Sequence, residues 1–217
     1  MHQGDRDGQK GLYHLNTIDE VTQWEIVGCV PQISERALVP VLQDLLVQYP
    51  FVIRGFHTDN GSEFINGVVA KLLNKLLIEF TKSRPRRTND QALVEGKNGS
   101  IVRKQMGYAH IPPSEAQKIQ CFYRETLNVY LNFHRPCGFA TEVVDKRGKV
   151  RKRYDTYLTP FEKLQSLPEA ERFLKEGVTL ADLERMAKAH SDTGYAQLLQ
   201  RRKAELFRSF TRSCILG

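Results

Sequence analysis

The order of the elements predicted over residues 12–81 constrains the fold of this chain more than any other feature. Residues 12–28 are typical of two strands around a turn near Asp19 and Glu20, because aromatic and β-branched residues fill them. After them, apolar residues at helical spacing alternate with short apolar runs of the buried-strand type. The predicted elements are a helix from Ser34, a strand over residues 51–56, a helix over residues 66–76 and a strand over residues 77–81. This strand–strand–helix–strand–helix–strand order predicts a layered α/β core.

Two further helices are predicted after this core. Helical patterns cover residues 93–106 and residues 114–132. Pro40 lies inside the first helix of the core, and we expect it either to kink that helix or to mark a later start. The reason is that proline lacks a backbone N–H and clashes with the preceding turn.

The character of the chain changes in its last third. Residues 143–157 predict a very basic hairpin that turns near Gly148, and residues 160–210 predict two or three short amphipathic helices. We therefore expect a core domain over residues 1–138 and an extension, made of the hairpin and the helices, over residues 139–217.

The composition is that of a globular protein. Of the 217 residues, 41% are hydrophobic and 26% are charged, which is ordinary for a globular chain. The sequence has no run of about 18 apolar residues and no basic-then-apolar signal peptide, so we expect a cytoplasmic protein without a membrane partner. The four cysteines are scattered without a CxxC pair, which argues against disulfides and a zinc knuckle.

The chain carries an excess of positive charge. Its formal net charge is +7 and its pI is about 9.3, which favours a polyanionic partner such as nucleic acid. The positive residues gather in three places, although such runs can also be solvated surface. These places are Arg84, Arg86 and Arg87, then residues 146–153, and finally Arg201, Arg202 and Lys203.

Two carboxylates are the candidate catalytic and metal-binding residues. Asp59 directly follows a predicted buried strand, which is where an open α/β sheet usually carries its site. The run Asp59, Asn60, Gly61 would also serve as an ordinary turn. Glu95 lies near the start of a predicted helix, where a glutamate can simply complement the helix dipole.

Distinct motifs surround both carboxylates. Residues 57–64 have the sequence HTDNGSEF, 35 residues separate Asp59 from Glu95, and VEGKN follows at residues 94–98. The sequences YLNFHRP and TPFE come later, at residues 130–136 and 159–162. Over residues 12–164 this pattern resembles the superfamily of DDE transposases and retroviral integrases. The signature of that family is two aspartates and a glutamate, with a similar interval between the second aspartate and the glutamate. A basic hairpin between the last two motifs is less common there.

The resemblance implies a ribonuclease-H-like mixed sheet flanked by helices, and an enzyme that cleaves DNA and joins strand ends. It implies that Asp59 and Glu95 are catalytic and hold two Mg²⁺ or Mn²⁺ ions. Two such cations about 4 Å apart stabilise the attacking and leaving oxygens of an in-line displacement, and Mg²⁺ prefers oxygen ligands. It also implies DNA as partner, a homo-oligomer assembled on DNA ends, and a bacterial-type mobile element that acts at the nucleoid.

The first aspartate of the family is expected upstream of this chain. That residue lies in the middle of the family's first strand, and the second strand here begins near Leu12, so counting back puts the first strand almost entirely before Met1. We therefore expect the chain to be inactive by itself. The alternative is that Asp5 or Asp7, which fall in a predicted turn, act as a shifted ligand.

DNA contacts are expected around Glu95 and in the basic hairpin. The arginine-rich loop before Glu95 is expected to cover the metals, and the helix after it to contact phosphates. The hairpin should attract a duplex in a salt-dependent manner. The expected DNA-binding residues are Arg84, Arg86, Arg87, Asn98, Arg103, Lys104, Arg151, Lys152 and Arg153.

Two other functions stay open at this point. The chain could be a catalytically incomplete DNA-binding module that competes with a full-length enzyme, or a ribonuclease-H-like nuclease that hydrolyses without joining. The reading frame upstream of Met1 separates the module from the enzyme, because an in-frame strand that ends in aspartate favours the enzyme.

Overall fold

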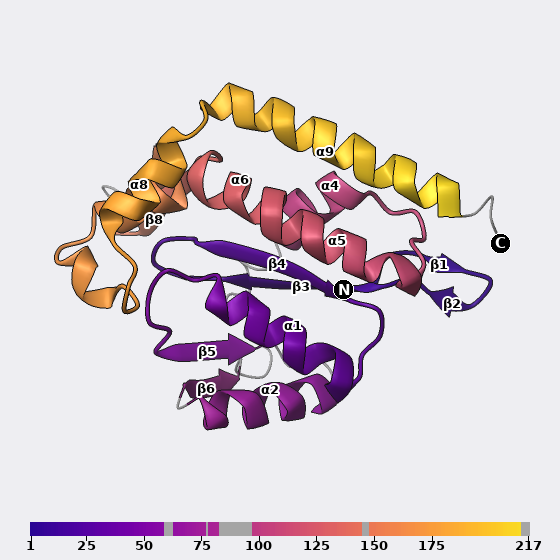
Figure 1. The fold of residues 1–217 in the computed structure, drawn as a ribbon. Coiled ribbons are helices and arrows are strands. Elements are labelled where there is room, and N and C mark those ends of the chain that lie inside the picture. Colours follow the sequence, from indigo (N-terminus) through magenta and orange to yellow (C-terminus); the bar gives the residue numbers. More distant parts are fainter. Residues whose placement is uncertain (59–62, 77, 83–96, 145–147, 214–217) are drawn as a thin grey trace.

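The computed structural model describes residues 1–58, 63–76, 78–82, 97–144 and 148–213, and it shows a mixed α/β fold (Figure 1). After a short hairpin, the first part follows the order of strands and helices expected from the sequence. Its elements are β1 (Asp5–Arg6), β2 (Gln9–Lys10), β3 (Tyr13–Ile18), β4 (Glu25–Val30), α1 (Glu35–Val47), β5 (Gly55–Thr58), α2 (Glu63–Lys75) and β6 (Glu79–Lys82).

The second part contains helices and one long hairpin. Four successive segments make an unbroken helical run over residues 113–133, which confirms the helix predicted over 114–132. The elements are η2 (Asn98–Arg103), α4 (Lys104–Met106), η3 (Pro113–Glu115), α5 (Ala116–Phe122), η4 (Tyr123–Leu127), α6 (Asn128–Phe133), β7 (Cys137–Val144), β8 (Val150–Leu158), α7 (Pro160–Gln165), η5 (Ala170–Phe173), α8 (Leu180–Lys188) and α9 (Asp192–Ser213).

The first three predicted elements are confirmed. β3 and β4 pair antiparallel around a turn in which Asp19 Oδ2 accepts hydrogen bonds from the backbone N–H and the hydroxyl of Thr22. The side chain of Ser34 caps α1 by accepting from the backbone N–H of Ala37. Pro40 lies inside α1, so it does not mark a later start of the helix.

The strand predicted over residues 51–56 is wrong in its bounds. β5 begins only at Gly55 and pairs in parallel with β6. Phe51 instead forms an isolated bridge with Leu174 and packs edge-on against Trp24, with 6.2 Å between the ring centroids. The apolar run therefore marks burial rather than strand, because an aromatic side chain can be buried from a connecting segment.

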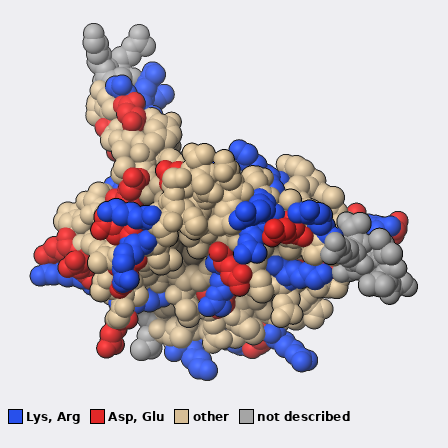
Figure 2. Space-filling view, turned by 45° about the horizontal axis from the view of Figure 1, so that its top comes forward, with Lys and Arg blue, Asp and Glu red and all other residues tan. Residues whose placement is uncertain are grey.

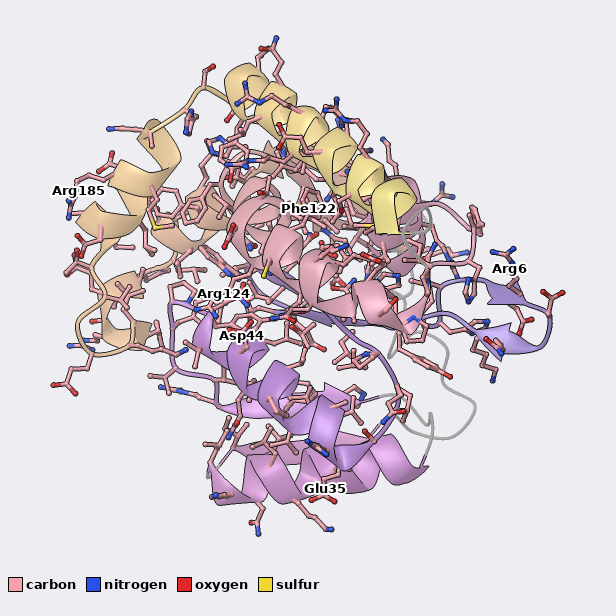
Figure 3. The ribbon with its side chains drawn as sticks, turned by 45° about the vertical axis from the view of Figure 1, so that its right-hand side comes forward. Arg6, Glu35, Asp44, Phe122, Arg124 and Arg185 are labelled. Atoms are coloured by element: carbon pink, nitrogen blue, oxygen red, sulfur yellow. The ribbon has the colours of Figure 1, made fainter. Side chains whose placement is uncertain are left out.

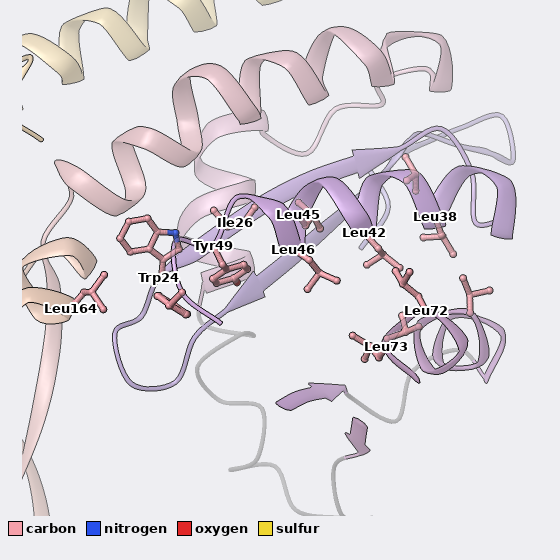
Figure 4. Close-up of a cluster of buried hydrophobic side chains, with 14 of the residues drawn as sticks. Trp24, Ile26, Leu38, Leu42, Leu45, Leu46, Tyr49, Leu72, Leu73 and Leu164 are labelled. Carbon is pink, nitrogen blue, oxygen red and sulfur yellow. The ribbon is translucent and has the colours of Figure 1, made fainter. Parts of the chain in front are cut away.

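β4 is buried on both faces and separates two hydrophobic clusters. Ile26 packs with leucines of α1 and α2 in the first cluster, which Figure 4 shows. Val27, on the opposite face, packs with residues of η2, α5, α6 and α9 in the second. Gly28 allows α1 to approach closely, since a Cβ at this position would lie 2.8 Å from Leu45 Cδ2. A strand covered on both faces explains why residues 25–30 have no polar alternation.

Side-chain amides cover the edge of β4 that faces away from β3. Asn132 accepts from the backbone N–H of Glu25 and donates to its carbonyl, both at 2.8 Å. Asn128 does the same for Val27, at 2.9 and 3.1 Å. The amide of Gln120 accepts from the next alternate N–H of β4 at 2.8 Å. A buried backbone group without a partner costs about 1–3 kcal/mol, so these amides stabilise an edge that a further strand would otherwise cover.

A polar cluster also links this helical run to α1. Arg124 Nη1 donates to Asp44 Oδ1 at 2.5 Å, and Gln120 Nε2 donates to Asp44 Oδ2 at 3.0 Å. Figure 3 shows Arg124 and Asp44 close together on neighbouring helices. These contacts join α1 to the helical run, and Gln120 also bonds β4, so both helices are held to that strand.

A buried chain of hydrogen bonds fixes the first residues against the core. His14 Nε2 lies 2.9 Å from Gln3 Oε1, and His14 Nδ1 lies 2.9 Å from the hydroxyl of Tyr123. Gln3 Nε2 donates to the carbonyl of Ala109 at 2.8 Å. Burial, with smaller contributions from the positive N-terminus and Arg103, lowers the pKa of His14 from 6.5 to about 3. The imidazole is therefore neutral at pH 7.

We expect the free energy of unfolding to fall, through His14, as the pH drops from about 6.5 towards 3. The unfolded chain binds a proton at the ordinary pKa, whereas the folded chain resists protonation until the pH nears the lowered value. At about 1.4 kcal/mol per pKa unit, the loss approaches roughly 3–5 kcal/mol. Urea unfolding between pH 7 and pH 4 should show a weaker pH dependence for His14→Asn than for the parent. An NMR titration that puts the His14 imidazole near pH 6.5 would contradict this expectation.

The last third of the chain confirms the basic hairpin, as β7 and β8, although β7 begins six residues before the predicted start at residue 143, and it corrects the helices that follow. α9 is one helix of 22 residues rather than a short segment. Its Leu199 joins the second cluster, while Phe161 of α7 and Leu183 of α8 join the first, so residues on both sides of the predicted boundary share both clusters. The division at 138 and 139 stays a prediction. Within the described ranges, no helix is long and apolar enough to cross a membrane.

Candidate active site

The two predicted catalytic carboxylates lie next to described elements in the chain: Asp59 follows β5, and Glu95 precedes a helical segment. β5 runs parallel to β6, so the carboxyl ends of both strands lie at the same edge. β5 ends at Thr58, one residue before Asp59, and the described helical segment resumes at Lys97, two residues after Glu95. Asp59 and Glu95 themselves lie outside the described residues, so their separation stays a prediction. The arginines of the loop lie outside them too: Arg84, Arg86 and Arg87.

Lys97, two residues after Glu95 in the chain, forms a buried ion pair. Its Nζ lies 3.5 Å from Oε2 of Glu25 and donates to Sγ of Cys137 at 3.2 Å. The side chain of Lys97 is 9% exposed and that of Glu25 is 1% exposed. The pair therefore joins the start of the helical segment to the central strand β4 and to the start of β7.

Polar groups surround the Glu25 carboxylate. Burial raises the pKa of Glu25, while the Lys97 ammonium, the Asn16 amide and Arg135 oppose that rise. Asn16 Nδ2 donates to Glu25 Oε1 at 3.0 Å. Removing two charges from water costs several kcal/mol for each ion, so the pair needs these neighbours to persist. Because Lys97 lies two residues beyond Glu95, the ion pair can fix the direction of the helical segment that follows Glu95.

Sequence reasoning missed Glu25 and Lys97. Glu25 opens the otherwise apolar strand EIVGCV, and an acid in a strand buried on both faces requires a cationic partner. That signal was available. The identity of the partner was not, because Lys97 lies far along the chain and reaches Glu25 only through the tertiary fold.

Asp5 and Asp7, the alternative ligands, belong to the short hairpin of β1 and β2. In the described part of the chain, no group of three or more His, Cys, Asp or Glu is arranged to hold a metal ion. Asp5 Oδ1 accepts a hydrogen bond from the backbone N–H of Gly8 at 3.1 Å, and Asp7 has a left-handed φ of 54°. Both aspartates are exposed and serve the turn between β1 and β2, which favours the turn over the shifted ligand. Asp59 and Glu95 offer the oxygen ligands that Mg²⁺ prefers.

The described DNA-binding candidates fall into two groups. Arg103 Nη2 donates to the carbonyl of His2 at 3.1 Å, and its guanidinium lies 5.0 Å from the ring centroid of Tyr108. Arg103 therefore has a structural contact with the first residues, and its predicted DNA contact has to compete with it. Lys104, the next residue, is exposed, and the side chain of Asn98 is not among the described ones. The second group is exposed on β8 and consists of Arg151, Lys152 and Arg153.

Comparison with known proteins gives one relative of undetermined role. No family model matches the chain. The chain is similar to the uncharacterized protein y4rM of Sinorhizobium fredii, with 30% identity over 161 residues. The similarity takes in 73% of this chain and 45% of that protein, so the chain spans about half the length of the relative that it matches.

Proposed function

We propose that this chain belongs to the catalytic region of a DNA recombinase of the transposase and integrase kind, which cleaves phosphodiester bonds and joins strand ends. One observation carries the proposal. The sequence HTDNGSEF begins in β5 and puts Asp59 directly after that strand in the chain, and Glu95 comes after 35 intervening residues, two residues before the described helical segment. This spacing and both flanking motifs resemble the metal-binding aspartate and glutamate of that superfamily.

The arrangement of strands supports a ribonuclease-H-like sheet. β3 and β4 form an antiparallel pair and β5 and β6 a parallel pair, with α1 between them in the chain. The first residues lie along the free side of β3: Gln3 N–H donates to the Leu12 carbonyl, and His14 N–H to the Met1 carbonyl, both at 2.7 Å. A strand leading into Met1 would run along β3 on the side away from β4, where β5 and β6 lie (Figure 1). Such a strand would supply the first aspartate of the family.

The chemistry follows from the ligands. Asp59 and Glu95, with an aspartate from the added strand, would hold two Mg²⁺ ions. The ions would stabilise charge on the attacking and leaving oxygens of an in-line displacement. The chain itself needs no nucleophilic side chain for this reaction. Its own residues supply the oxygen ligands, hold the helix after Glu95 through Lys97 and Glu25, and bind the DNA backbone.

The upstream reading frame provides the direct test. The 217-residue chain by itself is expected to show no strand transfer with Mg²⁺ or Mn²⁺, because the resemblance calls for three carboxylate ligands and Asp59 and Glu95 match two of them. A version extended upstream by one strand is expected to join a labelled DNA end to a target plasmid. Gel analysis of the products measures both activities. Robust joining by the unextended chain would overturn the expectation and point to Asp5 or Asp7, cleavage without joining would favour a nuclease, and DNA binding without either would favour the incomplete module.

A further inference from the structure

The β7–β8 hairpin is an exposed arm. Beyond its first residues, both strands are exposed up to the tip, including Val144, Val150 and Tyr154, which are 64%, 53% and 54% exposed. Figure 2 shows the hairpin as a narrow arm that stands out from the body. Its exposed side chains therefore contribute little to the core.

The pairing register gives the arm two different faces. Arg151 lies opposite Val143, and Arg153 lies opposite Thr141, so both arginines point to one face. We call it the arginine face. Residues two apart on a strand are about 6.6–6.8 Å apart. Lys152 lies on the opposite face, directly across from Glu142, so that its charge is balanced there.

An irregularity in the hairpin keeps the two faces distinct towards its base. The register shifts between Phe139 and Thr141, which places Tyr154 and Tyr157 together over Gly138. A Cβ at Gly138 would lie 3.4 Å from an atom of each ring. Gly138 lies four residues before Glu142 on β7, so the two residues share a face, and both tyrosines lie on the face of Lys152 rather than on the arginine face.

The arginine face continues onto the body of the protein. Phe139 lies two residues before Thr141 on the same face, and the ammonium of Lys163 in α7 lies 5.3 Å from its ring centroid. Asp155 reduces the positive charge of Arg153, because its Oδ2 lies 2.5 Å from Nε of that arginine. Both partners of that ion pair are more than half exposed, so it is weak and screened by salt.

We infer that the arginine face of this arm binds the phosphate backbone of a DNA duplex, while the face of Lys152 does not. The inference rests on the proposed function for its choice of DNA. A two-stranded ribbon fits within a major groove of about 12 Å, and arginine forms paired hydrogen bonds with phosphate oxygens. Because backbone contacts carry no sequence information, the arm positions the duplex and does not select its sequence.

The test is the salt dependence of binding to a fluorescent duplex of random sequence, measured by anisotropy between 50 and 200 mM KCl without divalent cations. Each phosphate contact contributes about 0.9 to the slope of log affinity against log salt, so Arg151→Ala with Arg153→Ala should flatten the slope by roughly 1.8. Lys152→Ala is the matched control from the same strand and should leave the slope within about 0.5. Arg151→Lys with Arg153→Lys should keep the slope, because both positive charges remain.

Each other outcome overturns the inference. An equal effect of Lys152→Ala would mean that the arm attracts DNA through its total charge, and an unchanged slope in the double alanine variant would mean that the arm is a solvated surface. Tighter binding to polyglutamate than to the duplex would indicate an acidic protein partner. A failure of the proposed function looks different, because the upstream-extended chain would then bind the duplex with the expected slopes and still join no DNA ends.

Discussion

Strand transfer by the upstream-extended chain is expected to fall by more than about a hundredfold when Asp59 is replaced by asparagine. Loss of a residue that only orients a metal ligand costs roughly 10–100-fold in affinity or activity, so loss of the ligand itself should cost more. Glu95→Gln should have an effect of the same order. The double variant should be little worse than either single one, because residues that act as one unit do not contribute additively. Product formation with Mg²⁺ measures the rate.

Two aspartates of the β1–β2 turn provide matched controls. Asp5 and Asp7 are exposed, and Asp5 already bonds within its turn, so Asp5→Asn and Asp7→Asn should change the rate by less than about threefold. Mn²⁺ bound per chain, counted by electron paramagnetic resonance, should drop in Asp59→Asn and Glu95→Gln but not in the controls. An Asp59→Asn variant with nearly full activity would exclude Asp59 as a ligand, and a loss in Asp5→Asn would identify the shifted ligand instead.

The sequence predicted the elements whose pattern is local. β3 and β4 were found because aromatic and β-branched residues surround a turn that Asp19 closes through its own side chain. The cap at Ser34 is equally local. Position 51 was misassigned because burial and strand formation give the same apolar signal, and only the tertiary fold shows that Phe51 pairs with Leu174. The length of α9 was missed because its exposed, highly charged face breaks the apolar periodicity.

The candidate site was predictable to the extent that it lies in continuous motifs. HTDNGSEF and VEGKN name Asp59 and Glu95 without any knowledge of the fold, and the structure adds that the first follows β5. The contacts of Lys97, which follows Glu95 closely in the chain, come from residues that are far apart in the sequence. Glu25, Lys97 and Cys137 come from three separate segments and meet only when β4, the helical segment and β7 pack together. Pairing of this kind depends on packing geometry, which no local pattern encodes.

Loss of the buried pair at this site should have the largest effect on stability. Lys97→Met keeps most of the length of the side chain but leaves the Glu25 carboxylate, 1% exposed, without its cation. Breaking one side of a buried ion pair destabilises by about 3–5 kcal/mol, because an uncompensated charge remains in the interior. Glu25→Gln with Lys97→Met removes both charges and should recover much of the loss. The midpoint and slope of urea unfolding give the free energy of each variant.

An exposed lysine on α2 separates the effect of burial from that of the substitution. Lys71 Nζ lies 3.8 Å from Oε2 of Glu35, and the two side chains are 75% and 58% exposed. Lys71→Met should therefore cost less than about 1 kcal/mol, as is usual for an ion pair in water. If Lys97→Met costs no more than Lys71→Met, the pair with Glu25 does not hold the helix after Glu95. If the double variant is as unstable as Lys97→Met alone, the loss comes from packing around the methionine and not from the unpaired charge. The expected pattern, a large single loss with partial recovery in the double variant, would assign the stability to the charge pair that joins β4 to the helical segment after Glu95 in the chain.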